Sequence, residues 1–164
     1  MIVVADTTPI NHLLLIGEIF ILRDLFERIV IPEVVQNELL AENTPETVKD
    51  FIASSPDWIE VRSVDYLFDS ELDTLDLGER DAIVLAEELQ ADSLLIDEKL
   101  GRRAAARRNL RIIGTLGIAD QAAEEGLIDF ASTLAKLKAN DFYVSIELEK
   151  YFLEKDKARK SSNG

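Results

Sequence analysis

The stretch LLIDEKLGRR, residues 94–103, combines the features that decide the fold class of this chain. It begins with a short apolar run typical of a buried strand, ends that run on the carboxylate of Asp97, and continues into a basic segment. A second stretch, IVVADTTP at residues 2–9, repeats the arrangement with Asp6. Two apolar strands that each end on an aspartate raise the question of what these carboxylates do.

Short apolar runs alternate with helical segments along the rest of the chain. We predict strands at residues 2–5, 29–31, 58–64, 93–96 and 111–114, with helices between and after them. This alternation favours a parallel sheet covered on both faces, a three-layer α/β fold, in which ligands bind beyond the carboxyl ends of the strands. Asp6 and Asp97 occupy such positions. Each could instead cap the helix that follows it, as Asp does well, and both interpretations stay open.

The composition of the chain excludes several classes of protein and of functional site. The 164 residues, 47% of them hydrophobic, suffice for one ordinary core, and we predict a single domain over residues 1–154 with a frayed basic tail over residues 155–164. The absence of cysteine excludes disulfides, thiolate catalysis and cysteine zinc sites, and the one histidine excludes a multi-histidine site. Neither a signal-peptide pattern nor an apolar run of the ~18 residues of a membrane helix is present, so we expect a cytoplasmic protein without a membrane segment.

The charge is strongly acidic but unevenly distributed. Thirty-two acidic against eighteen basic residues give a net charge of −14, which argues against a broad electrostatic grip on nucleic acid. A local basic patch nevertheless follows Asp97, formed by Lys99, Arg102, Arg103, Arg107, Arg108 and Arg111. The patch is either a solvated helix face or a local contact surface.

Further acids lie on the apolar faces of predicted helices. Glu38 comes one helical turn after Val34, so it shares the buried face of that helix, where a carboxylate needs a partner or a cation. Asp81 lies one turn before Leu85 and also faces inward. Glu79 is two positions earlier, roughly 200° around the helix, so Glu79 and Asp81 cannot aim at one point. Each also suits the first turn of a helix as a favourable charge.

Converging carboxylates point to a metal site. The acids expected to converge are Asp6, Glu38, Asp81 and Asp97, with Glu79 and Glu98 as additional candidates. Like charges raise one another's pKa, and a hard divalent cation such as Mg²⁺ or Mn²⁺ resolves the conflict. An all-carboxylate pocket therefore favours metal-assisted phosphodiester chemistry.

The chain resembles the PIN-domain family, in particular its small prokaryotic subgroup of predicted nucleic-acid-binding proteins related to VapC-type toxins. The resemblance covers roughly residues 2–138 and rests on an ordered set of motifs: VADTTPI, IPEVVQNEL, LDLGERDAIVLAEEL, LLIDEKLGRRAA and IIGTLGIA. It implies a PIN-like five-strand parallel sheet of order 3-2-1-4-5 and an Mg²⁺- or Mn²⁺-dependent ribonuclease site.

The same resemblance assigns the site residues. The four acids of the family map onto Asp6, Glu38, Asp81 and Asp97, and Thr8 matches the small polar residue that follows the first aspartate. Many relatives carry Thr or Ser at the position of Leu95, so the chain departs from the pattern there. The subgroup favours an acid at Glu79, which leaves Glu79 and Asp81 as alternative third ligands.

We therefore expect a ribonuclease, the toxin component of a toxin–antitoxin pair. Arg102, Arg103 and Arg107 would hold the RNA backbone, since phosphate contacts position a substrate without reading its sequence. The expected partners are RNA, a cognate antitoxin and a second copy of the chain, which would bind through residues 10–22 unless that segment is ordinary core. The alternative is a non-catalytic module that binds nucleic acid or protein. His12 is interpreted as packing or surface.

Overall fold

The computed structural model describes residues 1–163. It contains one parallel sheet formed by β1 (Val3–Ala5), β2 (Ile29–Pro32), β3 (Ile59–Arg62), β4 (Ser93–Leu95) and β5 (Ile112–Ile113). The strand order is β3-β2-β1-β4-β5. The predicted α/β fold with a five-strand parallel sheet of order 3-2-1-4-5 is confirmed.

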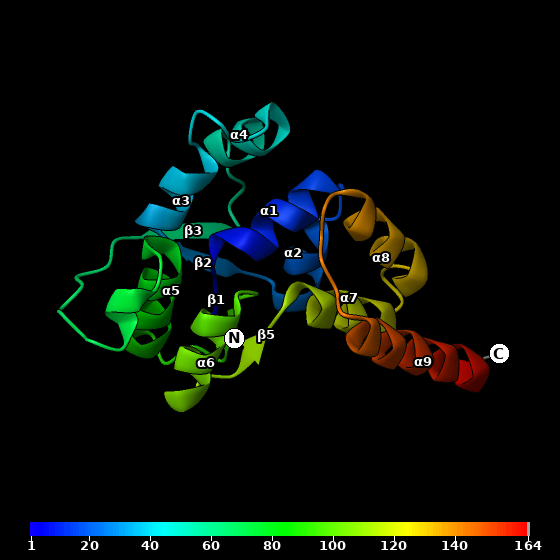
Figure 1. Cartoon of the computed structure of the whole chain (residues 1–164). Helices are drawn as coiled ribbons and strands as arrows, with labels where there is room; N and C mark the ends of the chain where they lie inside the picture. Colours follow the sequence, from blue (N-terminus) through cyan, green and yellow to red (C-terminus); the bar gives the residue numbers. More distant parts are fainter. Residues whose placement is uncertain (164) are drawn as a thin grey trace.

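Helices connect the strands and complete the chain (Figure 1). They are α1 (Thr7–Leu15), α2 (Phe20–Phe26), α3 (Glu33–Leu39), α4 (Glu46–Ala53), the 3₁₀ turn η1 (Leu72–Thr74), α5 (Leu77–Glu88), α6 (Lys99–Arg107), α7 (Thr115–Glu124), α8 (Phe130–Ala139) and α9 (Ile146–Asn163). Within residues 1–163, no helix combines the length and the apolarity needed to cross a bilayer.

Both faces of the sheet are buried because every residue of the central strand is apolar. Val3 and Ala5 pack into one core with side chains of α1, α2, α3, α4 and α7, whereas Val4 packs into a second core with α5 and α6. This alternation follows from the two-residue period of a strand. Burial of each valine side chain contributes about 1.5–3 kcal/mol, so the continuous apolar run requires helices on both sides.

The parallel topology brings the loops that follow the strands to one edge. β1 lies between β2 and β4, with Val4 opposite Val30 on one side and Leu94 on the other. The backbone amide of Asp6 donates to the carbonyl of Leu95 at 2.9 Å, which extends the pairing beyond β1. The residues after β1 and β4 are therefore neighbours at the carboxyl edge.

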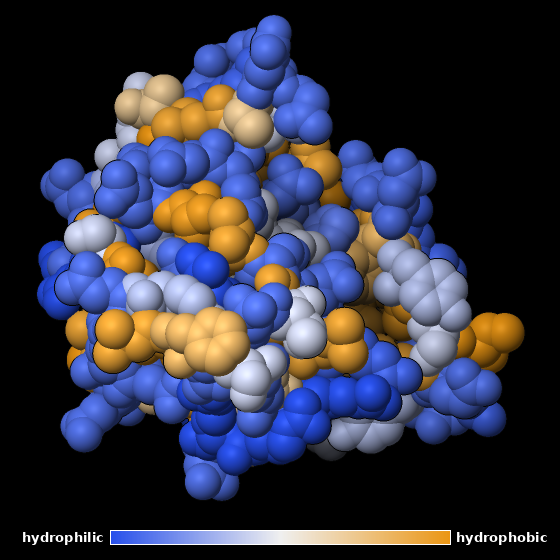
Figure 2. Space-filling model, turned by 60° about the vertical axis from the view of Figure 1, so that its left-hand side comes forward, coloured by the Kyte–Doolittle hydropathy of each residue, from blue (hydrophilic) through white to orange (hydrophobic). Residues whose placement is uncertain are grey.

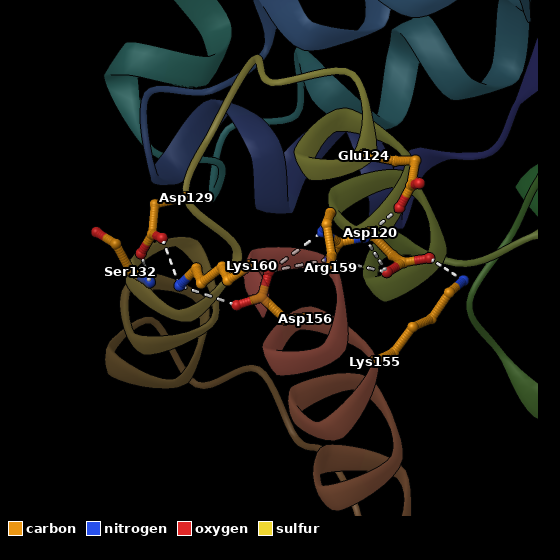
Figure 3. Close-up of polar contacts among 8 residues, drawn as sticks. All are labelled: Asp120, Glu124, Asp129, Ser132, Lys155, Asp156, Arg159 and Lys160. Carbon is orange, nitrogen blue, oxygen red and sulfur yellow. Dashed lines mark hydrogen bonds and ion pairs between the residues drawn. The ribbon is translucent and has the colours of Figure 1, made fainter. Parts of the chain in front are cut away.

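The end of the chain differs from the expected frayed tail. Residues 155–163 form the last part of α9, which packs on α7 and α8 beside a third apolar cluster that includes Phe130 and Leu137. Figure 3 shows the ion pairs that hold this part of α9. Arg159 bonds Asp120 and Asp156, and these three side chains are nearly buried. Lys155, Arg159 and Lys160 thus pair with acids of α7 or at the start of α8.

The face of the molecule drawn in Figure 2 is mainly hydrophilic, with apolar side chains in separate patches. Exposed large apolar residues include Leu67 and Phe68, in the segment between β3 and η1, and Tyr143 and Ile146, near the start of α9. Most of the apolar residues in segment 10–22 lie in the core of the chain itself, and Phe20 is its exposed aromatic residue.

Candidate active site

The two aspartates that end strands do not cap the helices that follow them. Asp6 takes the N-cap position of α1 without a side-chain capping bond, and its side chain is almost fully buried, at 2% exposure. Its Oδ1 atom has no hydrogen-bond partner. Asp97 instead accepts bonds from the backbone amide of Thr115 at 2.7 Å and from its hydroxyl at 2.6 Å, so it holds the start of α7. Asp6, in contrast, does not hold the start of a helix through its side chain.

Glu38 is brought to Asp6 across the edge of the sheet. α3 follows β2 and carries Glu38 toward α1, where the hydroxyl of Thr7 donates to Glu38 Oε2. Gly78 of α5 lies against both carboxyl groups. A Cβ atom at Gly78 would stand 2.9 Å from both Asp6 Oδ1 and Glu38 Oε2. A glycine at this position therefore leaves room for the two oxygens to lie side by side.

The start of α5 supplies two more acids. Asp76 caps the helix by accepting from the backbone amide of Glu79 at 2.9 Å. The Glu79 side chain is buried beside Gly101 of α6. Asp81 lies further along α5 and bonds Arg80 at 2.9 Å, and that guanidinium stacks on the ring of Tyr66. We call Asp6, Glu38, Asp76 and Glu79 the acid cluster, and Asp81 borders it with its own cation.

The protonation of the acid cluster reflects its burial. Burial, followed by the negative charges of Asp76, Glu79 and Glu38, raises the pKa of Asp6 from 3.8 to about 8, although the amide of Thr7 opposes the shift. Burial also raises the pKa of Glu38, and it raises the pKa of Glu79 from 4.5 to about 7 with help from Asp76. Asp6 therefore holds a proton near neutral pH, and Glu79 does so in part, unless a cation replaces it.

A family model described as a PIN domain matches residues 2–158. The chain belongs to the PIN-domain family. In the corresponding searches, no curated protein and no solved structure gives a significant match. Membership indicates a nuclease-like module, and PIN domains typically use divalent metal ions and act on nucleic acid.

The acid cluster of this PIN domain fits a hard cation in one respect. Asp6 Oδ1 is buried and unpartnered beside Glu38, and Gly78 keeps the space next to both oxygens open. Such an oxygen is costly to bury unless a cation or a proton accompanies it. Mg²⁺ commonly takes one or two protein carboxylates and retains its waters, so this pair is a sufficient protein contribution.

The expected convergence of four acids is only partly visible. Within residues 1–163, no three acidic, histidine or cysteine side chains are grouped so that they could hold a metal ion as they stand. Asp6 and Glu38 lie together, whereas Asp97 is bonded to Thr115 and Asp81 to Arg80. The physical reason is that the packing places hydrogen-bond donors beside both carboxyl groups, Thr115 next to Asp97 and Arg80 next to Asp81. The four-acid site stays a prediction.

Two other candidates are Glu98 and Thr8. Glu98 is exposed at the start of α6, and its charge contributes to the raised pKa of Glu79. Thr8 lines a hollow next to Asp97, while its neighbour Thr7 is the residue that bonds Glu38. Leu95, where many relatives carry Thr or Ser, is fully buried in the core.

The predicted RNA-binding arginines of α6 have different surroundings. Arg102 is half-buried and donates to the carbonyl of Ile96 at 3.2 Å. Arg103 is exposed, and Arg107, also exposed, lies 3.6 Å from a carboxylate oxygen of Glu71. Arg102 and Arg103 line one hollow at the surface, and Arg107 lies outside it. Only two of the three arginines therefore share a surface near Asp97.

Sequence reasoning missed Asp76 and Thr7. Asp76 stands three residues before Glu79, which is the spacing of an N-cap residue and a first-turn acid, and this pattern was available in the sequence. Nothing in the sequence indicates that the Thr7 hydroxyl reaches Glu38, 31 positions away, because that contact depends on how α1 and α3 pack.

Proposed function

We propose that this PIN domain is a metal-dependent endoribonuclease of the cytoplasm and the toxin component of a toxin–antitoxin pair. The observation that carries the proposal is the unpartnered, buried Oδ1 of Asp6 beside Glu38, at the carboxyl edge of a parallel sheet. An oxygen-only donor set of this kind suits Mg²⁺ or Mn²⁺.

In the proposed mechanism, Asp6 and Glu38 bind the cation, and Thr7 orients Glu38 through its hydroxyl. When bound, the cation neutralises the scissile phosphate and makes water a stronger nucleophile. Asp76 and Glu79 add negative charge around the site, which favours cation over proton at higher pH. Asp97, Asp81 and Glu98 stay candidate ligands that would have to leave their present surroundings.

Cleavage of RNA tests the proposal directly. The purified protein should cut a single-stranded RNA with Mn²⁺ or Mg²⁺ and should not cut it with EDTA. Glu38→Gln should lower the cleavage rate by at least about 100-fold, because the amide oxygen replaces a charged ligand. Glu33→Gln, an exposed acid on the same helix, is the matched control and should cut at the parent rate.

Two outcomes would contradict the ribonuclease. If no RNA is cut with either metal but RNA or a partner protein is still bound, the chain is the non-catalytic module that we considered as the alternative. If Glu38→Gln cuts as fast as Glu33→Gln, the cluster is not the active site.

The contribution of α6 to RNA binding is measured by salt dependence. Replacing Arg102, Arg103 and Arg107 with Ala should weaken binding of single-stranded RNA while leaving Mn²⁺-induced stabilisation intact. The slope of log Kd against log salt should fall by about 0.7 for each phosphate that the variant no longer neutralises. Arg28→Ala, an exposed arginine beside β2, is the control and should keep the parent slope. Weaker binding with an unchanged slope would assign the weakening to disturbed packing.

The toxin role implies a protein partner. A net charge of −14 suits a basic segment of an antitoxin, and the exposed side chain of Phe20 is a candidate contact for a second copy of the chain. Sedimentation of the parent and of Phe20→Ala tests the homodimer, because loss of a dimer in the variant supports the contact and a monomeric parent contradicts it.

A further inference from the structure

A large hollow lies beside Asp97, between α1 and β5. Its volume is about 680 Å³, within the usual range of small-molecule sites. Asp97 and Thr8 lie at its boundary with the strand ends, and its walls include His12, Phe142, Tyr143 and Phe152. We call this hollow the aromatic cavity. Its walls come from α1, from β5 and the start of α7, and from the segment 141–143 together with α9, so the C-terminal part of the chain forms one side of the cavity.

The aromatic cavity has a fixed back wall. Phe142 meets His12 edge to face at 5.0 Å between ring centroids, and Phe152 stacks with Phe130 of α8 at 5.9 Å. The other end of α9 is anchored to α7 by the ion pairs of Arg159 with Asp120 and Glu124 (Figure 3). The cavity therefore exists before any ligand arrives.

One aromatic side chain of the cavity has no such packing. Tyr143 is 87% exposed, although it lines the aromatic cavity. It also lines a second hollow of about 550 Å³, together with Lys99, Arg102 and Arg103. The Tyr143 ring thus stands between the aromatic cavity and a basic rim. This combination matches a nucleotide, whose base stacks on aromatic rings and whose phosphate pairs with cations.

The chemistry of the walls favours a base over a charged group inside the cavity. Burial lowers the pKa of His12, so this ring is neutral at physiological pH. Its Nδ1 is buried without a hydrogen-bond partner. Three acids, Asp97, Glu98 and Asp141, line the cavity against one cation, Arg102, so the cavity repels a phosphate on balance. Lys99 and Arg103 attract a phosphate on the rim. A paired base cannot enter such a cavity, so the nucleic acid must be single-stranded.

We propose that the aromatic cavity receives one unpaired base of single-stranded RNA, from a nucleotide next to the one whose phosphate reaches the acid cluster. Tyr143 is the stacking surface, and Lys99 and Arg103 hold the adjoining phosphate. The inference rests on the proposed ribonuclease function and adds to it a subsite for a flanking base.

The test measures binding of a fluorescent RNA in the Glu38→Gln background, where the strand stays uncut. The probes are a single strand, its duplex, and single strands with one abasic site on either side of the cleaved bond. The intact single strand should bind about tenfold more tightly than the duplex and than one of the abasic strands. Tyr143→Ala should bind the intact single strand about tenfold more weakly than the parent does. It should also bind the intact strand and that abasic strand equally, since the same stacking interaction is removed in both cases.

Two further variants separate stacking from folding. Tyr143→Phe keeps the ring and should keep the parent affinity. Tyr151→Ala removes another exposed tyrosine, one that does not line the cavity, and should also bind as the parent does. If Tyr143→Ala retains the parent affinity, or if the duplex binds as tightly as the single strand, the proposal is overturned, and a cavity that serves a protein partner would give this result.

Different results would contradict the base subsite and the ribonuclease activity. A parent protein that cuts single-stranded RNA with Mn²⁺, but binds intact and abasic strands equally, keeps the ribonuclease and loses the base subsite. A parent that neither binds nor cuts RNA loses both.

Discussion

Asp6→Asn is expected to stabilise the metal-free protein at pH 8 and to abolish its stabilisation by Mn²⁺. Asp6 has a folded-state pKa of about 8 against an ordinary value of 3.8. Between these values the unfolded chain binds fewer protons than the folded chain, so the free energy of unfolding of the parent falls as pH rises from about 4 to 8. Glu79, with a pKa of about 7, contributes in the same direction.

The asparagine removes the largest part of this dependence because it carries no charge to bury. The melting temperature of Asp6→Asn at pH 8 should exceed that of the parent by roughly 5 °C, and its slope against pH should be shallower. Mn²⁺ at one hundred times its Kd should stabilise the parent by about 2.7 kcal/mol and leave the variant unchanged.

The matched control is Asp50→Asn, an exposed acid of α4. It should follow the parent in both pH slope and metal response. A variant at Asp6 that keeps the parent slope would contradict the raised pKa, and one that keeps the full Mn²⁺ response would remove Asp6 from the cation site. Thermal unfolding across pH, with and without metal, provides both measurements.

Arg159→Ala should be the most destabilising single substitution near the C-terminus. The guanidinium of Arg159, 8% exposed, bonds Asp120, Asp156 and Glu124 at 2.7–3.3 Å. Its removal leaves Asp120 and Asp156 buried with reduced compensation, since Lys155 and Lys160 reach them only from the surface. Losing one partner of a buried ion pair costs about 3–5 kcal/mol.

A loss of this size corresponds to a fall in melting temperature of roughly 10 °C for a chain of this length. Arg159→Lys should recover only part of it, because one ammonium group cannot bond three carboxylates as a planar guanidinium does. Lys150→Ala, at an exposed position on the same helix, is the control and should change stability little. If Arg159→Ala has the same melting temperature as Lys150→Ala, the ion pairs do not hold α9.

Metal and RNA binding by Arg159→Ala should respond differently, because α9 does not carry the acid cluster. The cation response should survive in Arg159→Ala, because the acid cluster belongs to α1, α3 and α5. Binding of single-stranded RNA should weaken instead, since Phe152 of α9 is a wall of the aromatic cavity.

Much of the architecture follows from sequence patterns that are local. The apolar runs around Val4, Val30 and Leu94 specify strands buried on both faces, and the helices between them require a parallel sheet. The ordered motifs identify the PIN-domain family, and the family model over residues 2–158 confirms that assignment. The strand order came from the family resemblance, because periodicity alone does not say which strands are neighbours.

The candidate site could be anticipated only as a set of acids. Strand ends at Asp6 and Asp97, and the apolar face that carries Glu38, are visible as sequence patterns. The partner of each carboxylate is not visible, because hydrogen bonds form between groups that the fold brings together from distant positions. Asp97 finds Thr115 and Glu38 finds Thr7 in this way.

The sequence by itself determined the α/β class, the family and the group of residues from which the site is drawn, because these depend on patterns along the chain. Only the tertiary structure decided which acid is left without a partner, which ones are already neutralised, and how the basic end of the chain is used. The reason is energetic: a buried charge takes whichever donor or counter-ion the packing provides, and that choice depends on contacts across the fold. Asp6 is left unpartnered at Oδ1, whereas Arg159 finds three carboxylates.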